Sequence, residues 1–253
     1  MTVCYFTASG NCLYVARRIG GALLSIPKLM RQDTIEISDG AVGVVAPVYA
    51  LEPPMMVREF LAKAKIQTDY FFFIYTYGMG YAEAFLHVEL AARHSGLDLK
   101  YINAVQMVDN YLPIFDMREQ IATLPEKDVE GQIARILDEL AARKERRVDA
   151  TPERLDRMES LMRTHAAGIL KKDTALGYRT TDACVRCGIC AKVCPANNIA
   201  VTSAGVTFFD RCEVCYACLH NCPKNAIRMP VEASSARFRN EHVTLADVIQ
   251  ANE

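Results

Sequence analysis

Two cysteine-rich segments constrain the fold of this chain more than any other feature of its sequence. The first reads CVRCGICAKVCP at residues 184–195 and the second reads CEVCYACLHNCP at residues 212–223. Both follow the spacing C-x2-C-x2-C-x3-C-P, and together they contain eight of the ten cysteines. A disulfide scaffold is not expected, because such scaffolds are typical of small secreted chains and this chain has 253 residues. We expect the thiols to be reduced and most of them to bind metal.

The spacing within each block predicts an iron–sulfur site. Three thiolates that lie close in sequence can wrap one corner of a [4Fe–4S] cube and bind three irons, so the fourth iron needs a ligand from elsewhere in the chain. The fourth cysteine of a block lies one helical turn further on and faces the other cluster. We therefore expect two clusters with exchanged fourth ligands, one held by Cys184, Cys187, Cys190 and Cys222 and one by Cys212, Cys215, Cys218 and Cys194.

An internal repeat supports this interpretation. Asn197 and Ile199 follow the first block at the positions that Asn225 and Ile227 occupy after the second. Such a repeat is expected of two half-domains that each lend a ligand to the other. The alternative is a pair of zinc sites, since C-x2-C pairs also bind zinc, although zinc usually takes well-separated pairs. The segment resembles the bacterial two-[4Fe–4S] ferredoxins, and all eight ligand positions match.

The charge of the cysteine segment differs from that of the ferredoxins that the segment resembles. Residues 181–230 carry a formal charge of +2, from five basic residues (Arg186, Lys192, Arg211, Lys224, Arg228) and three acidic residues (Asp182, Asp210, Glu213). Ferredoxins of this type are commonly acidic. Positive charge near a cluster favours its more negative, reduced state, so we expect the cluster potential to be raised.

The N-terminal part of the chain alternates strand-like and helix-like patterns. Strands are predicted at residues 3–6, 34–37, 42–48, 70–77 and 99–107. Helical apolar spacing lies between most of them, at Leu13 to Leu24, Met56 to Ala64 and Ala82 to Ala92. Several strands are almost continuously apolar, which is typical of a parallel sheet covered by helices on both faces. We predict an α/β fold with a doubly wound, parallel, five-stranded sheet, followed by a helical connector and a small α+β cysteine domain.

A loop of small and hydroxyl residues, TASGNC at residues 7–12, follows the first predicted strand and opens a helix. Such a loop brings several backbone N–H groups to the positive end of the helix, which is typical of a phosphate site. It is neither a Walker A sequence nor a GxGxxG motif. A plain helix cap is the alternative interpretation.

Two further loops make a flavin site the better prediction. Ligands of doubly wound folds lie at the carboxyl ends of the strands, and the loops after the 42–48 and 70–77 strands read PVYALEPP (47–54) and YGMGY (77–81). A flavin ring needs flat apolar partners on its faces and backbone groups at its polar edge. Tyr49 is a candidate for stacking on one face, and Tyr77 or Met79 on the other. Gly78 and Gly80 would let the main chain approach.

This half of the chain resembles the flavodoxins, whose phosphate loop reads T-x-S/T-G-N-T/S. The resemblance implies FMN, bound by residues of the three loops (Thr7, Ala8, Ser9, Gly10, Asn11, Cys12; Pro47, Val48, Tyr49, Ala50; Tyr77, Gly78, Met79, Gly80). Position 12 is Cys where the family has a hydroxyl, so only the backbone N–H of Cys12 keeps its expected role. Cys12 is either a tolerated small side chain or a reactive thiol, since a helix N-terminus lowers thiol pKa. Cys4 is expected in the core, and Asn110 is a further candidate for the flavin edge.

Residues 126–180 are predicted to form a helical connector that packs between the two ends of the chain. One helix has apolar positions at Ile133, Ile136, Leu137 and Leu140, and a second begins at Thr151-Pro152 and has an apolar stripe at Leu155, Met158, Met162, His165 and Ile169. Thr244 and Asp247 resemble the capping box of a short terminal helix. The predicted domains are thus 1–125 (FMN), 126–180 (connector), 181–230 (two clusters) and 231–253 (tail with a short helix).

Composition excludes several classes of function. The formal net charge of −1 gives no reason to expect a nucleic-acid partner. No apolar run approaches the ~20 residues of a membrane helix, and the first residues show no basic segment followed by an apolar one. We therefore expect a soluble, cytoplasmic protein without a membrane span. No nicotinamide motif is visible, so direct NAD(P)H oxidation is not expected.

The whole chain resembles the hybrid family in which a flavodoxin-like domain precedes a two-cluster ferredoxin domain. The resemblance implies transfer of low-potential electrons between FMN and the clusters, to or from a redox partner protein such as a ferredoxin, reductase or dehydrogenase, in anaerobic metabolism. One alternative is an FMN-dependent reductase of a small molecule, with the clusters as electron inlet and Tyr49, Tyr81, His87 and Asn110 as candidate proton donors. Another is a subunit that docks on a larger complex through the connector helices. A homodimer is also possible.

Overall fold

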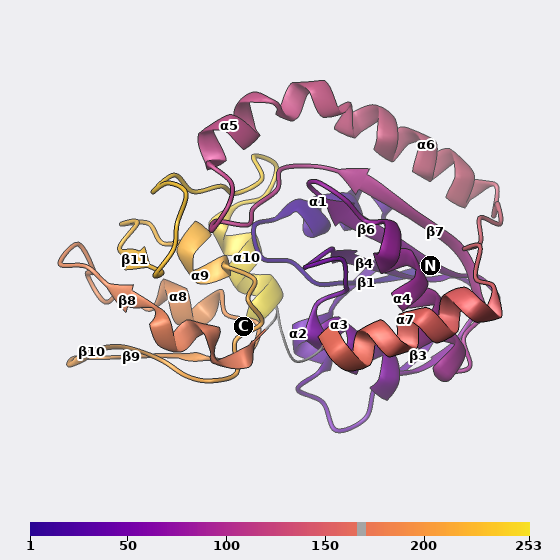
Figure 1. Ribbon diagram of the computed structural model, residues 1–253, viewed down its shortest axis with the longest axis horizontal. Coiled ribbons are helices and arrows are strands. Elements are labelled where there is room, and N and C mark those ends of the chain that lie inside the picture. The colour runs from indigo at the N-terminus through magenta and orange to yellow at the C-terminus, as the bar shows by residue number, and fades with distance from the viewer. Residues whose placement is uncertain (166–170) are drawn as a thin grey trace.

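A computed structural model describes residues 1–165 and 171–253 (Figure 1). Its main element is a five-stranded parallel sheet made of β1 (Thr2–Tyr5), β2 (Ala22–Ser25), β4 (Val42–Pro47), β6 (Phe71–Tyr77) and β7 (Leu99–Gln106). The strand order is β2-β1-β4-β6-β7. Counting only the strands of this sheet, the order is 2-1-3-4-5, which is the flavodoxin-like version of the doubly wound fold. The predicted fold class is confirmed.

One strand of the sheet differs from the prediction. Helix α1 (Asn11–Ile19) ends earlier than expected, because Gly20 and Gly21 follow it with φ of +83° and +82°. The apolar residues after this turn form β2, which pairs in parallel with β1. The prediction of a sheet strand at 34–37 was therefore wrong. Those residues overlap β3 (Glu36–Ser38), which pairs with β5 (Lys65–Gln67) in a separate two-stranded sheet.

Helices cover both faces of the sheet. On one face lie α1 and α6 (Val129–Ala141), and on the other lie α2 (Ile26–Leu29), α3 (Met55–Lys63) and α4 (Ala82–His94). The strands between these layers are buried: β6 exposes none of the residues from Phe71 to Thr76. This two-sided burial explains why the strand sequences are continuously apolar.

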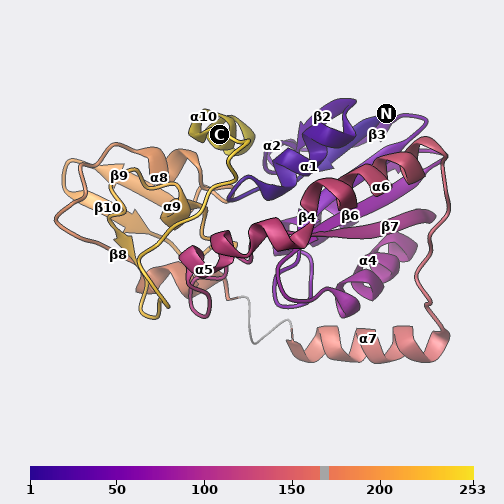
Figure 2. The ribbon, with the colours of Figure 1, turned by 90° about the horizontal axis from the view of Figure 1, so that it is seen from above.

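The connector helices lie elsewhere than expected. Helix α6 packs on β7 and α1, and α7 (Pro152–His165) packs outside α4 through Met158, Leu86 and Leu90. Figure 2 shows α7 on the outer side of the sheet domain, away from the cysteine domain. The prediction that the pair packs between the two ends was wrong, because Ile133 and Ile136 of α6 and Met158 of α7 are buried against the sheet domain. The predicted stripe position Ile169 lies outside the described residues, as do the side chains of Met162 and His165.

The cysteine domain is built from short elements arranged as two repeats. Strand β8 (Arg179–Thr180) pairs antiparallel with β11 (Ile227–Arg228), and β9 (Ile199–Thr202) pairs antiparallel with β10 (Gly205–Phe208). Each cysteine block contains one short helix, α8 (Ile189–Lys192) or α9 (Ala217–His220). Irregular segments and short helices surround this domain: α5 (Met117–Ala122), η1 (Leu124–Lys127) and η2 (Lys172–Gly177).

The C-terminal tail lies between the two domains and covers the phosphate loop (Figures 1 and 2). It ends in α10 (Leu245–Asn252), whose capping box of Thr244 and Asp247 is formed as predicted. The Asn240 backbone N–H donates to the Ser9 carbonyl, and the Asn252 side-chain amide donates to the Thr7 carbonyl. Sequence reasoning left the role of this tail open. Its contacts hold the loop in place from the outside.

Candidate cofactor sites

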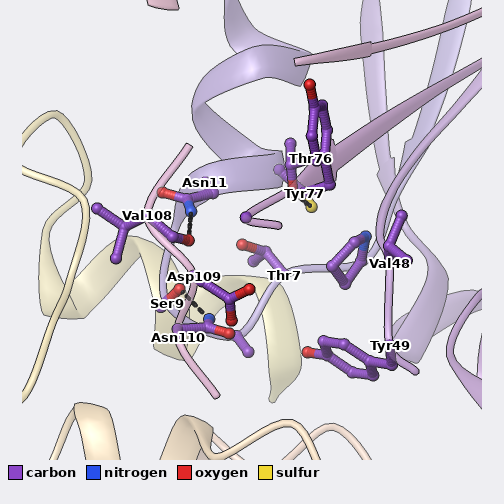
Figure 3. A pocket seen from close by; sticks show the side chains of 14 residues that line it. Thr7, Ser9, Asn11, Val48, Tyr49, Thr76, Tyr77, Val108, Asp109 and Asn110 are labelled. Carbon is purple, nitrogen blue, oxygen red and sulfur yellow. Dashed lines mark hydrogen bonds between the residues drawn. The ribbon is translucent and has the colours of Figure 1, made fainter. Parts of the chain in front are cut away.

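The loop between β1 and α1 forms one wall of a cavity at the carboxyl ends of the sheet strands (Figure 3). Its helix end has no side-chain cap, because the N-cap residue is Gly10. The cavity lies where the strand order of the sheet reverses, which is the usual ligand position in this fold. Ten of its lining residues belong to the predicted FMN site: Thr7, Ala8, Ser9, Asn11, Cys12, Pro47, Val48, Tyr49, Tyr77 and Gly78.

A second cavity of about 420 Å3 adjoins the first. The two share Val48, Tyr49, Gly78, Asp109 and Asn110 as lining residues. The predicted residues Ala50, Met79 and Gly80 line this second space. We call the two spaces together the flavin cavity, because they join the uncapped helix end to the two loops predicted for the ring.

The side chain of Thr7 tests whether this site fits a phosphate. Its hydroxyl is buried and has no hydrogen-bond partner among the described residues. A buried hydroxyl without a partner is costly, and this one lies at a helix N-terminus, where an anion is favoured. The site therefore fits the phosphate of FMN, and Thr7 would supply a side-chain donor in addition to the backbone N–H groups.

The side chains of Asn11 and Ser9, which were also predicted to bind the phosphate, form hydrogen bonds within the protein. The Asn11 side-chain amide donates to the Val108 carbonyl and accepts from the amide of Asn240, so it joins the loop to its surroundings. Ser9 accepts a hydrogen bond of 2.7 Å from the Asn110 amide. Both contacts tie the loop to residues after β7, and Figure 3 shows them.

Cys12 is a buried structural thiol. It is 2% exposed and its Sγ lies 3.1 Å from the Thr76 hydroxyl. Burial raises the pKa of Cys12 to about 12, so the helix N-terminus does not produce a reactive thiolate here. Of the two alternatives raised by the sequence, the tolerated small side chain is the one that the structure supports. Cys4 is fully buried in the core, as predicted.

The packing of the C-terminal tail requires a glycine at position 10, whether or not a ligand is bound. Its φ is +100°, and a Cβ added there would lie 2.9 Å from the Val243 Cβ and 3.0 Å from the Asn240 Cβ. Gly10→Ala should lower the free energy of unfolding by about 2–5 kcal/mol, through backbone strain and overpacking. Gly96→Ala is the matched control, since its φ is +70° and nothing lies within 4 Å. Urea unfolding compares the two, and equal losses would show that the tail contact carries no strain.

In the cavity at the phosphate loop, sequence reasoning missed three lining residues: Thr76, Val108 and Asp109. Thr76 is in β6, and the other two directly follow β7, so their position at the carboxyl ends of strands could have indicated them. Burial raises the pKa of the Asp109 carboxyl above its ordinary value. Its Oδ1 accepts from the Tyr111 backbone N–H at 3.1 Å. Asp109 thus places a protonatable group in the wall between the two parts of the cavity.

Four cysteines of the predicted first cluster line one cavity in the cysteine domain. They are Cys184, Cys187, Cys190 and Cys222, and the remaining lining is largely apolar. Burial raises the pKa of the Cys190 thiol to about 11, and the negative charge of the Cys222, Cys184 and Cys187 thiolates also raises it. The fourth cysteine of the second block therefore lies with the first three of the first block. Four thiols around one space fit the ligand set of a [4Fe–4S] cluster.

The other four cysteines form a second group. Burial raises the pKa of Cys215 well above its ordinary value, and the neighbouring thiolates of Cys212 and Cys194 raise it further. The same two thiolates act on Cys218. Cys194 thus lies with the second block. Among residues 1–165 and 171–253, no three His, Cys, Asp or Glu side chains are placed to hold one metal ion, whereas the thiolates of a cubane each bind a different iron.

The two blocks share an unusual backbone. Arg186 and Val214, each two residues after the first cysteine of its block, have φ of +54° and +53°. Gly188 and Tyr216 also correspond and have φ of +79° and +56°. Equivalent backbone N–H groups donate to the sulfurs of Cys194 and Cys222, both over 3.3 Å. The internal repeat seen in the sequence is therefore a repeat of conformation, and it aims N–H groups at thiol sulfurs in both halves.

The second cysteine group borders the flavin cavity. Val214 and Tyr216, which lie between its cysteines, line that cavity. Tyr49, which also lines that cavity, lies near the same cysteine group. Burial raises the pKa of Tyr49 most, and the negative charge of Cys215 is the next largest cause. Cys215 is also part of the hydrophobic core of the sheet domain. One wall of residues therefore separates this thiol group from the space predicted for the flavin.

Hydrogen bonds from the cysteine domain reach the flavin loops. The Asn221 side-chain amide donates to the Ala8 carbonyl at 3.0 Å. His220 accepts from the Phe238 backbone N–H at Nδ1, so its Nε2 carries the proton and donates to the Asn110 carbonyl. Burial lowers the pKa of His220 to about 4, which keeps the ring neutral near pH 7. His87, by contrast, is buried in α4 beside Glu52.

The chain was compared with protein-family models, curated proteins and solved structures. Residues 178–200 match the family described as the 4Fe-4S binding domain. A search of curated proteins gives no match. Among solved structures, a flavodoxin from the domain Archaea is 16% identical with a TM-score of 0.32, covering 54% of this chain and 97% of that one. A flavoprotein from Bacteroides eggerthii is 16% identical with a TM-score of 0.30, covering 51% of this chain and 97% of that one.

No helix among the described residues is both long and apolar enough to cross a membrane. The strand order of the sheet is flavodoxin-like, and the cysteine domain contains the match to the 4Fe-4S binding domain. The chain thus combines a sheet domain with the flavodoxin-like strand order and a cysteine domain that contains a match to the 4Fe-4S binding domain.

Proposed function

We propose that this protein binds one FMN and two [4Fe–4S] clusters and transfers electrons between them and a partner redox protein. When bound, FMN exchanges two electrons, singly or together, and each cluster carries one, so two clusters match the pair that one flavin releases. The residues Thr7, Ser9 and Tyr49 would hold the flavin, and the two groups of four cysteines would hold the clusters. Because such centres are sensitive to oxygen, the protein would work in anaerobic metabolism.

The observation that carries this proposal is the shared wall between the two sites. Val214 and Tyr216 come from the second cysteine block and line the flavin cavity. Tyr216 has a left-handed backbone, with φ of +56°, where the first block has Gly188. A bulky residue in this region is strained, and such strain is concentrated at functional sites. Its ring also lies 5.8 Å from that of Tyr111, another lining residue.

A direct test measures the centres and the transfer between them. Protein purified without oxygen should contain about eight iron, about eight sulfide and one FMN per chain. After a pulse of a one-electron reductant, redistribution between flavin and cluster absorbance should proceed at a rate that does not depend on protein concentration, because the centres belong to one chain. Colourless protein, or protein that contains zinc, would contradict the proposal.

Thr7→Val tests the phosphate site through two opposite effects. The FMN dissociation constant should rise about 10- to 100-fold, because a hydrogen bond to a charged group contributes ~1.5–3 kcal/mol. The stability of the FMN-free protein should stay equal or rise, because the buried hydroxyl has no partner among the described residues. Thr2→Val is the matched control: Thr2 donates to Asp39 at 2.9 Å, away from the loop. It should lower stability and leave FMN binding unchanged.

A small-molecule reductase is the second candidate, and Asp109 is the observation in its favour. Its carboxyl has a raised pKa and lies between the two parts of the flavin cavity, where a proton donor is useful. Turnover of a small substrate with reduced methyl viologen, without any partner protein, would favour this candidate. Asp109→Asn should then abolish turnover while FMN stays bound.

A further inference from the structure

The two cysteine groups differ in their distance from solvent. In the group that borders the flavin cavity, Cys194, Cys215 and Cys218 are buried and Cys212 is half-buried. In the other group, Cys187 is exposed and Cys184, Cys190 and Cys222 are half-buried. The group that borders the flavin cavity is thus the more enclosed of the two, and the group that lines the cavity of the cysteine domain opens to the surface. An external electron carrier can approach the cysteine domain most closely at this open group.

The surface around the open group is positively charged. Its described lining residues include two cations, Arg186 and Lys224, and no carboxylate. Arg179 and Arg228 face each other across the β8–β11 pair beside it. Segments 179–190 and 222–228 contain four cations, Arg179, Arg186, Lys224 and Arg228, and one carboxylate, Asp182, so their formal charge is +3 before the thiolates are counted.

Arg186 and Lys224 are free to meet a partner. Both are exposed, and neither forms an ion pair within the described residues, whereas Arg17 and Arg147 elsewhere are paired with carboxylates. The Arg186 guanidinium donates to the Ser203 carbonyl at 3.2 Å, which fixes its direction. A fixed, unpaired guanidinium is well suited to bind carboxylates of another protein.

An apolar patch lies inside this charged rim. Val185 is 59% exposed, and Pro223 and Cys187 are exposed beside it. An apolar centre with a polar rim is typical of protein interfaces, and small interfaces of this kind suit transient redox encounters. We propose that the surface formed by Val185, Arg186, Cys187, Pro223 and Lys224 is the docking site for an acidic one-electron carrier protein. We call it the basic docking surface.

Charge complementarity selects an acidic partner. Three of the four thiolates, those of Cys184, Cys190 and Cys222, lie at half-buried cysteines. Arg186 and Lys224 are exposed, so an approaching protein meets two cations and the one exposed thiolate, that of Cys187, at the surface. Attraction of this kind raises association rates by 10- to 1,000-fold and falls steeply with salt. The inference rests on the proposed electron-transfer function and adds the site and the partner class.

The test uses the fully loaded protein and a small acidic two-[4Fe–4S] ferredoxin as probe. Binding of the two oxidised proteins is measured by calorimetry at low and high salt, so that no turnover is needed. Arg186→Glu/Lys224→Glu should weaken binding at low salt by about 10- to 100-fold, and the difference should vanish above ~0.3 M salt, where charges are screened. Basic cytochrome c should show the opposite change. Arg186→Gln/Lys224→Gln should give an intermediate loss.

Arg154→Glu/Arg157→Glu on α7 is the matched control, since both residues are exposed and lie on the sheet domain away from β8 and β11. It makes the same change in net charge and should alter binding less than twofold. Iron, sulfide and flavin are counted in each sample, and the cluster potential is measured. Absence of iron would refute the proposed function itself. If the Arg186 and Lys224 variants contain iron, sulfide and flavin, bind the probe as tightly as the wild type and differ only in a lower cluster potential, the proposed docking surface would be refuted.

Discussion

Cys222→Ala should remove the cluster of the first cysteine block, although Cys222 belongs to the second. In the structure this residue lines the cavity formed by Cys184, Cys187 and Cys190. By the same geometry, Cys194→Ala should remove the cluster of the second block. Each single variant should lose about half of the iron, because a cubane with three thiolates is held poorly. Double variants decide which cysteines act together.

Cys184→Ala/Cys222→Ala should retain about half of the iron, because both residues serve one cluster. Cys184→Ala/Cys194→Ala should retain almost none. Iron and sulfide per folded chain, together with the electron paramagnetic resonance signal of the reduced protein, measure the outcome. The reverse result would mean that each block holds its own cluster. Cys4→Ala is the control, since this thiol is buried in the sheet core and should not affect iron content.

Removal of iron by a chelator should unfold residues 181–230 and leave the sheet intact. The buried residues of the cysteine domain include cysteines themselves, with Cys194 and Cys218 in its core. A segment this small cannot bury enough apolar surface to remain folded without its metal. Hydrogen exchange should show loss of protection across this segment, whereas β6 in the sheet domain should remain protected. Native-like protection of residues 181–230 without iron would contradict the expectation.

The same treatment should weaken FMN binding. The carbonyl of Ala8 accepts a hydrogen bond from Asn221, and the carbonyl of Asn110 accepts one from His220. Both donors lie in the cysteine domain and hold loops of the flavin cavity. Loss of two hydrogen bonds of ~1 kcal/mol each corresponds to a rise in the FMN dissociation constant of roughly 10- to 30-fold. Titration of chelated and untreated protein with FMN measures this change, and Asn221→Ala should reproduce part of it.

The sequence predicted β1, β4, β6 and β7 well and β2 poorly. Residues 42–48, 70–77 and 99–107 lie on β4, β6 and β7, because strands buried on both faces keep a long apolar run. Strand β2 has only the residues Ala22–Ser25 and directly follows a helix. A short apolar run of this kind is equally compatible with a helix end. The Gly20-Gly21 pair was the signal that could have separated the two.

The residues of the candidate sites were also predicted only in part. Residues that act through local spacing were visible in the sequence, such as the TASGNC loop and the grouping of three cysteines in each block. Residues that long-range contacts bring to the site, such as Tyr216 and Asn240, were not visible in the sequence. Tyr216 lines the flavin cavity only because the cysteine domain is seated against the sheet domain, where Glu213 accepts a hydrogen bond from the Met56 backbone N–H at the start of α3.

The sequence by itself determined which chemical groups this protein carries: two sets of thiols at cluster spacing and a phosphate loop between a strand and a helix. Such motifs depend on neighbours a few residues apart, so their geometry follows from local backbone conformation. Only the tertiary structure decided how the groups are ordered, with one thiol group enclosed beside the flavin cavity and the other open to solvent. That order depends on the packing of surfaces far apart in the chain, and no local pattern encodes it.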